Sequence, residues 1–188
     1  MPTSLAIDLE LTHTAEPVVA WRTWALTGRR DATELRLRPV AGRARPWAPG
    51  RPTEAVCRIR LHRAPHVDCT CGLHGTHEPE ILRRTRSPGV LGRAALWGRV
   101  IEHELGFRAE FGYPQRLRLI CFFCFLLHGI TRCAADVVCS FGRGRLMPLC
   151  EEHHDGALRY GMIPVAVHDA GRVDQELRAS YAVDVLAL

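Results

Sequence analysis

The chain has 188 residues, a net charge of +5 and a hydrophobic fraction of 47%. That apolar content is enough to bury a core as one domain or two small ones, and no apolar run is long enough to cross a bilayer as a helix. Residues 1–10 lack the basic-then-apolar order of a signal peptide, so we expect a cytoplasmic location. Thiols stay reduced there, which favours metal binding over disulfides for the eight cysteines.

The first quarter of the chain contains strand and loop signals. Residues 5–40 hold short apolar and alternating runs, of which 34–38 has the period of two expected for a half-buried strand. Residues 27–31 are typical of the turn that precedes this strand. Residues 39–52 are too rich in proline for a regular element, so we expect an ordered loop with Trp47 packed against the body.

A hairpin is the main prediction for the middle of the chain. It follows a His- and Pro-rich loop at 55–79 and a short helix at 81–86. Its strands are expected at 94–102 and 107–111, and Gly112-Tyr113-Pro114 is expected to end it.

The last third predicts mixed elements, which begin with renewed alternation at 116–119. Residues 135–138 and 141–145 indicate a strand, a glycine turn and a return strand. Further signals predict helical turns at 155–160, a strand at 163–167, a helix at 173–180 and a docked apolar tail at 181–188.

Together these elements predict an α+β, β-rich fold. We expect a partly open barrel or curved antiparallel sheet in a domain at 1–118, which carries the cysteine-rich loop 55–79. A zinc-ribbon-like segment with a strand and helix tail is expected at 119–188.

The strongest chemical signal is a pair of short hooks, Cys121-x2-Cys124 and Cys150-x2-His153. Each hook brings two ligands to one side of a metal, and the strand, turn and strand between them return the second pair. The sequence therefore predicts a Cys3His zinc site. His154 is an alternative to His153, and burial as small apolar side chains is the alternative for the thiols.

A second zinc site is predicted from Cys57, His66, Cys69 and Cys71. Nearby alternatives for the imidazole ligand are His62, His74 and His77. Gly72 permits the sharp backbone turn that the tight C-x-C hook needs. A buried or reactive thiol cluster is the alternative interpretation.

Two strings of the N-terminal two thirds resemble a family of small uncharacterised actinobacterial-type proteins. They read A-P-H-x-x-C-x-C-G at 64–72 and G-R-x-A-L-W-G-R-V-I-E-H-E-x-G-F-R-A-E at 92–110, followed by Tyr113 and Pro114. The resemblance covers roughly residues 18–120, departs from the family at 73–75 and Gly112, and implies no particular activity. The C-x-x-C…C-x-x-H segment resembles small zinc ribbons, which serve nucleic-acid contact, protein contact or folding support.

These features predict a zinc-binding structural or binding module that holds one or two zinc ions and contacts nucleic acid or a protein partner. All 25 basic residues are arginines, which suits phosphate recognition, although a GC-rich coding sequence also favours arginine. The candidate nucleic-acid contacts are Arg116, Arg118, Arg143 and Arg145. No catalytic constellation is present, and an enzyme is the less favoured reading.

Two alternatives to the binding module stay open. A metal-dependent enzyme would use an open metal position, or Glu102 and Glu104 with a histidine. A thiol-based redox sensor would use Cys133, Cys139 or the C-x-C pair, although core packing is the favoured role for Cys133 and Cys139.

Overall fold

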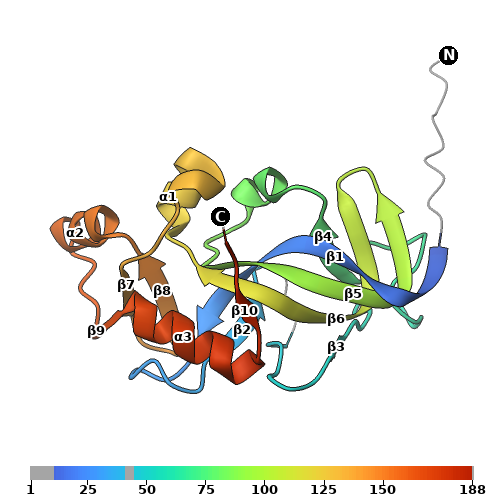
Figure 1. The fold of residues 1–188 in the computed structure, drawn as a ribbon, viewed down its shortest axis with the longest axis horizontal. Helices are drawn as coiled ribbons and strands as arrows, with labels where there is room; N and C mark the ends of the chain where they lie inside the picture. Colours follow the sequence, from blue (N-terminus) through green and yellow to red (C-terminus); the bar gives the residue numbers. More distant parts are fainter. Residues whose placement is uncertain (1–10, 41–44, 188) are drawn as a thin grey trace, which may run out of the picture.

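Three long antiparallel strands form the centre of the fold (Figure 1). The computed structural model describes residues 11–40 and 45–187, and the sequence signals at 5–10 and 41–44 lie outside them. In the order in which they pair, the long strands are β1 (Leu11–Thr27), β5 (Val90–His103) and β6 (Gly106–Leu119). The β5–β6 pair is the predicted hairpin, and both of its strands are longer than the sequence indicated.

Shorter strands extend the sheet and bend it. Strand β4 pairs with β6 and returns to β1 through one pair, Trp21 with Thr76, so β1, β5, β6 and β4 partly close on themselves. The sheet is therefore curved and partly ringed but is not a barrel, which confirms the β-rich α+β prediction. The shorter strands are β2 (Arg36–Pro39), β3 (Thr53–Glu54), β4 (Leu73–Thr76), β7 (Val137–Ser140), β8 (Arg145–Leu149), β9 (Ala166–Asp169) and β10 (Asp184–Val185).

The helices are short and pack around the sheet (Figure 1). They are the 3-10 helices η1 (Pro79–Arg84) and η2 (Gly129–Arg132), and the α-helices α1 (Phe122–His128), α2 (Glu151–Arg159) and α3 (Ala170–Tyr181). The Asp169 carboxylate accepts the N–H of Arg172 at 2.7 Å and so caps the N-terminus of α3. Among the described residues, no helix combines the length and apolar character needed to cross a membrane.

The predicted end of the hairpin at Gly112-Tyr113-Pro114 is wrong, because β6 continues to Leu119. Pro114 pairs with Ala94 beside a register shift between Arg93 and Ala94. A proline has no N–H to give to a ladder, and an irregular position in the sheet tolerates that loss.

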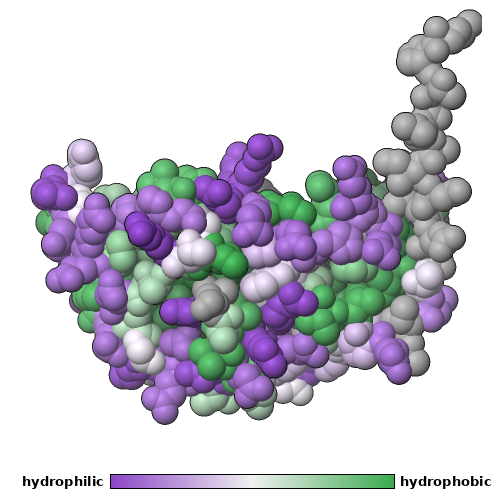
Figure 2. All heavy atoms as spheres, turned by 45° about the horizontal axis from the view of Figure 1, so that its top comes forward, coloured by the Kyte–Doolittle hydropathy of each residue, from purple (hydrophilic) through white to green (hydrophobic). Residues whose placement is uncertain are grey.

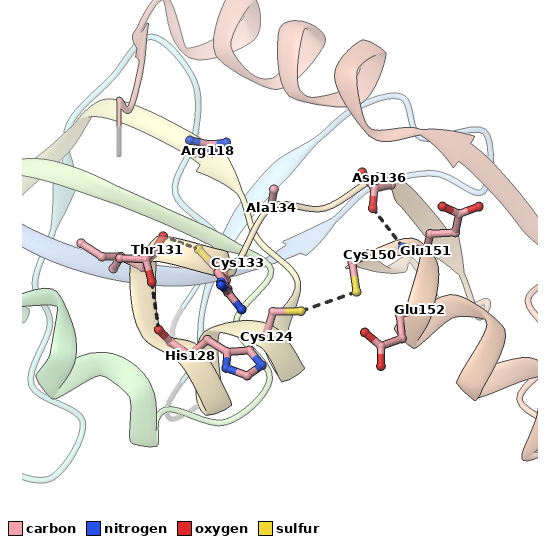
Figure 3. A pocket seen from close by; sticks show the side chains of 12 residues that line it. Arg118, Cys124, His128, Thr131, Cys133, Ala134, Asp136, Cys150, Glu151 and Glu152 are labelled. Atoms are coloured by element: carbon pink, nitrogen blue, oxygen red, sulfur yellow. Dashed lines mark hydrogen bonds between the residues drawn. The ribbon is translucent and has the colours of Figure 1, made fainter.

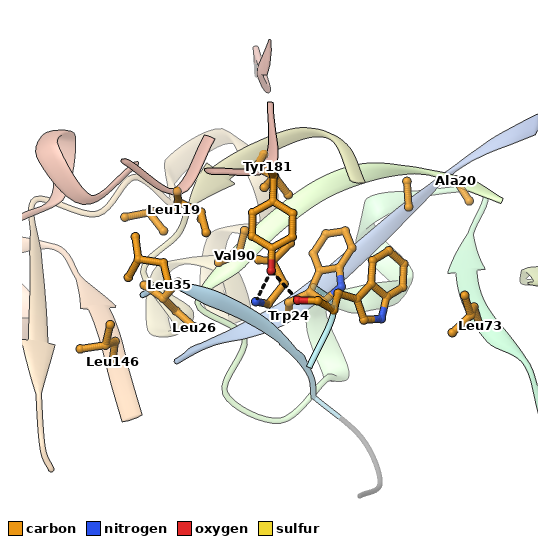
Figure 4. Packing of buried hydrophobic residues seen from close by; sticks show 14 of the residues in the cluster. Ala20, Trp24, Leu26, Leu35, Leu73, Val90, Leu119, Leu146 and Tyr181 are labelled. Carbon is orange, nitrogen blue, oxygen red and sulfur yellow. Dashed lines mark hydrogen bonds between the residues drawn. The ribbon is translucent and has the colours of Figure 1, made fainter. Parts of the chain in front are cut away.

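The core contains two tryptophans and a tyrosine that join distant segments (Figure 4). The rings of Trp24 and Trp47 meet edge to face with centroids 5.3 Å apart. The Tyr181 hydroxyl donates to the carbonyl of Trp47 at 2.6 Å and accepts the N–H of Leu37 at 3.0 Å. The end of α3 is thereby fixed to β2 and to the Pro-rich loop, and Trp47 is buried as predicted.

The C-terminal segment continues the sheet of the N-terminal strands. Leu26 at the end of β1 pairs with Leu146 of β8, and β8 pairs in turn with β7. The hairpin β7–β8 is the strand, turn and strand that the sequence predicted between the two metal hooks.

Candidate metal centres

The structure brings together the four predicted ligands of the C-terminal site, Cys121, Cys124, Cys150 and His153, with all ligand atoms within 4.8 Å of one another. The Sγ of Cys124 lies 3.5 Å from the Sγ of Cys150 and 3.4 Å from Nδ1 of His153. The Sγ of Cys150 lies 3.0 Å from the same nitrogen. Tetrahedral zinc with bonds of about 2.3 Å to sulfur and about 2.0 Å to nitrogen places its ligands about 3.5–3.8 Å apart. The group therefore fits one zinc ion after small adjustments.

Each hook of the C-terminal site is the junction of a strand with a helix. Cys121 directly precedes α1 and Cys124 lies in the first turn of that helix, while Cys150 and His153 have the same relation to α2. Residues three apart in a helical turn lie on one face, so each junction presents two ligands in one direction. The predicted hooks are therefore helix starts in the structure, where the sequence indicated turns.

A small apolar cluster supports the C-terminal site. Cys121, Cys139 and Leu149 are fully buried in this cluster. The ring of Phe123 stacks on the imidazole of His153 at a centroid distance of 5.0 Å and an interplanar angle of 12°. This contact helps to hold the imidazole with Nδ1 toward the sulfurs.

Burial favours the protonated form of the C-terminal thiols when no cation is bound. Burial raises the pKa of Cys124 and Cys150 above the ordinary thiol value. Clustered neutral thiols at this position would make only weak hydrogen bonds, whereas a divalent cation deprotonates the sulfurs that bind it.

A pocket of about 710 Å³ lies beside this site (Figure 3). Cys124 and Cys150 line it together with side chains of both charges, and the Asp136 carboxylate accepts the N–H of Glu151 at 3.0 Å. Since four protein ligands complete a tetrahedral shell, the pocket lies next to the metal position without offering an open coordination site.

The N-terminal site consists of Cys57, His62, Cys69 and Cys71, again with ligand atoms within 4.8 Å of one another. The Sγ atoms of Cys57 and Cys69 lie 3.8 Å apart. The imidazole in this group is that of His62, which the sequence left as an alternative to His66. The His66 ring lies 4.8 Å from that of His62, and its Nδ1 accepts the N–H of Asp68.

The hydrogen bonding of the His62 imidazole leaves one ring nitrogen able to bind a metal. Its Nδ1 lies 3.1 Å from the carbonyl oxygen of Arg63. Its Nε2 is buried and has no hydrogen-bond partner within residues 11–40 and 45–187. A metal-bound histidine usually donates its other ring N–H to a carbonyl or carboxylate, so His62 leaves Nε2 for the ion.

The local backbone and burial set the thiol pKa values of this site and the path of its C-x-C hook. The N–H groups of Ile59 and Arg60 point at Cys57 and lower the pKa of its thiol to about 7, whereas burial raises the pKa of Cys71 to about 11. Gly72 has φ of +132°, and a Cβ there would lie 3.0 Å from Cβ of Arg108. The C-x-C hook thus makes the glycine-dependent turn that the sequence predicted.

A buried arginine fastens the N-terminal loop to the sheet. The guanidinium of Arg108, on β6, donates to the carbonyl oxygens of His66, Cys69 and Cys71. Arg108 is only 7% exposed. Charged hydrogen bonds of this kind are stronger than neutral ones, so Arg108 orders the backbone that carries two of the thiols.

Glu110 makes a second charged contact beneath the same loop. Glu110 is only 2% exposed, and its carboxylate accepts the Nε–H of Arg63 at 2.6 Å and the backbone N–H of Arg99 at 3.2 Å. Burial alone would raise the pKa of Glu110, but these donors and the charges of Arg63 and Arg99 outweigh it and lower the pKa overall. The carboxylate is therefore ionised and ties the loop to β6.

The remaining candidate ligands and thiols are engaged elsewhere. His74 contacts the Thr70 carbonyl at 2.9 Å, and His154 lies 3.7 Å from Asp155. Cys133 and Cys139 are fully buried, and burial raises the pKa of each thiol to about 11. A protonated, inaccessible thiol is a poor nucleophile, which supports the packing role predicted for these two residues.

The predicted nucleic-acid arginines fall into two pairs. Arg143 and Arg145 lie at the β7–β8 turn and line a common pocket, whereas Arg116 and Arg118 are on β6 and Arg118 faces the pocket beside the C-terminal site.

No protein-family model, curated protein or solved structure matches this chain.

Proposed function

We propose that this chain is a structural zinc module that holds two zinc ions and contacts nucleic acid. The observation that carries the proposal is the pair of Cys3His groups, each with its ligand atoms within 4.8 Å of one another. Three thiols and one imidazole form a donor set that suits zinc, because zinc accepts soft sulfur and imidazole ligands in a tetrahedron.

The geometry supports a structural role for both ions. Four protein ligands leave no position for the water or substrate that a catalytic zinc must bind. Each ion would instead tie segments together: two helix starts at the C-terminal site, and a loop without regular structure at the N-terminal site. An enzymatic use of either metal is therefore the weaker alternative.

Nucleic-acid contact is supported by charge and by the position of the arginines. The chain carries a net charge of +5, and Arg143 and Arg145 are both exposed at the tip of the hairpin between the C-terminal hooks. One guanidinium group can donate two parallel hydrogen bonds to the oxygens of a phosphate. A hairpin fixed by a zinc ion would hold the two arginines in one orientation.

The test uses the zinc-loaded chain and fluorescein-labelled 12-nucleotide DNA and RNA, single- and double-stranded, in anisotropy titrations at 50 and 200 mM salt. We expect binding that weakens with salt, since phosphate contacts release counterions. Absence of binding to all four probes at 50 mM salt would overturn the nucleic-acid part of the proposal, and zinc counting tests the metal part separately.

A protein partner is the second candidate, because apolar side chains are exposed around the end of α2 and β9. Tyr160 is 89% exposed and Ile163 is 77% exposed, and β9 is the last strand at its end of the sheet. Figure 2 shows apolar patches between the polar side chains on one face of the molecule. This candidate gains support from two results together. Nucleic acid does not bind, and Ile163→Asp abolishes a specific cross-linked complex with a protein partner, which the control variant Leu105→Asp retains.

A further inference from the structure

A second pocket lies on one face of the strands β2, β1 and β8. In the register of these strands, Arg38 is opposite Ala25, and Arg145 is opposite Thr27. Directly paired residues point to the same side of a sheet, so both arginines flank the small side chains of Ala25 and Thr27. The opposite side carries Leu26, which is part of the core.

Small residues on the central strand leave this face hollow. The pocket has a volume of about 280 Å³ and is completed by Phe122 at the start of α1 and by the segment that contains Pro88. Buried Pro39 and Pro148 contribute to its walls. The hollow therefore has a rigid, largely apolar base with polar groups at its rim.

The rim of the pocket is strongly positive. It carries four exposed arginines from separate segments: Arg38 of β2, Arg86 after η1, Arg143 of the β7–β8 turn and Arg145 of β8. None of the described residues that line the pocket is acidic, and within the described ranges none of these arginines has a carboxylate within 4.0 Å. By contrast, the pocket beside the C-terminal metal site contains Asp136, Glu151 and Glu152.

Two rim residues have an unusual backbone conformation. Ser87 has φ of +46° and Arg143 has φ of +51°, both in the left-handed region that side chains other than glycine rarely adopt. A strained backbone conformation persists only where the surrounding structure holds it, and such conformations are often found at binding sites. Here it sets the direction of two segments that border the pocket.

We infer that this pocket binds phosphate groups. Guanidinium groups placed around one pocket repel one another, an anion between them lowers that repulsion, and phosphate accepts paired hydrogen bonds from several arginines at once. The phosphate could belong to a nucleic-acid backbone or to a free phosphorylated molecule. If the phosphate is that of a nucleic acid, the inference rests on the proposed function. If it is that of a free phosphorylated molecule, the inference does not depend on the proposed function.

The test compares two double variants that remove the same charge. Arg38→Met with Arg145→Met removes one arginine from each side of the pocket, whereas Arg51→Met with Arg159→Met removes two exposed arginines elsewhere. Equal zinc content and equal melting temperature show that both variants are folded. Each protein is titrated with inorganic pyrophosphate by calorimetry and with the labelled 12-nucleotide single strand by anisotropy.

We expect the pocket variant to lose at least about tenfold in affinity for the probe that binds, with the control within about twofold of the wild type. If the single strand binds through the pocket, the slope of log affinity against log salt also falls by about 1.4, because two phosphate contacts are lost. Pyrophosphate binding that the pocket variant abolishes identifies the free source.

Equal affinities for the pocket and control variants would overturn the inference, as would a wild type that binds neither probe. The two proposals fail in different ways. Single-strand binding that the pocket variant leaves intact, together with no pyrophosphate binding that depends on the pocket, removes the pocket but keeps the proposed function. Pyrophosphate binding without nucleic-acid binding removes the proposed nucleic-acid function but keeps the pocket.

Discussion

The two candidate zinc sites use the same donors on very different supports. At the C-terminal site the ligands lie at the starts of α1 and α2, and Cys121 belongs to a buried apolar cluster. At the N-terminal site every ligand lies in the loop between β3 and β4, and charged contacts from Arg108 and Glu110 hold that loop. An ion at the first site would stabilise a core, while an ion at the second would order a surface loop on a sheet that folds around other contacts.

Loss of the C-terminal ion is expected to have the largest effect. Cys124→Ser should remove one zinc per chain and lower the free energy of unfolding by about 4 kcal/mol or more, because structural zinc binding is coupled to folding. Denaturant unfolding and zinc counting on the same samples measure both effects. Cys139→Ala is the matched control, since Cys139 is buried nearby but lies outside both ligand groups. An unchanged zinc content in Cys124→Ser would contradict the assignment of this site.

Loss of the N-terminal ion should be milder and local. We expect Cys69→Ser to remove one zinc and lower the free energy of unfolding by about 1–3 kcal/mol, since only a loop loses its anchor. Hydrogen exchange should rise at 55–72 while the amides of β7 and β8 stay protected. Cys133→Ala serves as the control that keeps both ions. Loss of protection throughout the sheet would show that the two sites do not differ in the way proposed.

Removal of the arginine beneath the N-terminal loop tests its polar support. Arg108→Met should cost about 2 kcal/mol, because three carbonyl oxygens lose a charged donor, and should speed zinc release from the N-terminal site to a chelator. Arg84→Met, at an exposed position, should change stability by less than about 0.5 kcal/mol. Equal release rates in the two variants would exclude the supporting role of Arg108.

The smallest expected effect is the pH dependence of Glu110. Its pKa is lowered in the folded chain, so its ionised form contributes stability above the ordinary glutamate pKa of about 4.5, and this contribution is lost as the pH falls through the folded value. The stability difference between wild type and Glu110→Gln should therefore be full at pH 6 and shrink below about pH 4.5. Glu54→Gln is the exposed control. A stability difference between wild type and Glu110→Gln that grows as the pH falls would contradict the ion pairs of Glu110.

Local patterns predicted much of this molecule. The spacing of Cys121, Cys124, Cys150 and His153 depends only on short hooks and a hairpin, so the sequence was sufficient to identify that group. The alternation in β5 and β6 likewise predicted their pairing. The imidazole of the N-terminal site is different: the short spacing of His66 to Cys69 favoured His66, but the path of the loop in space places His62 with the thiols.

Arg108 and Glu110 were missed as supporting residues for a physical reason. They alternate with the apolar residues Phe107, Ala109 and Phe111, and such a pattern ordinarily places the charged side chains in solvent. In the structure the N-terminal loop covers that face of β6, so both charges are buried. A charged residue that a loop covers has no signal in sequence periodicity. Conversely, Pro114 predicted the end of a strand that an irregular pair allowed to continue.

The most direct test of the two-site account is the zinc content of the purified chain, measured by native mass spectrometry together with elemental analysis. The account predicts two zinc ions per wild-type chain, one in Cys124→Ser and one in Cys69→Ser. A zinc-replete preparation with no bound metal, or variants that retain two ions, would contradict it.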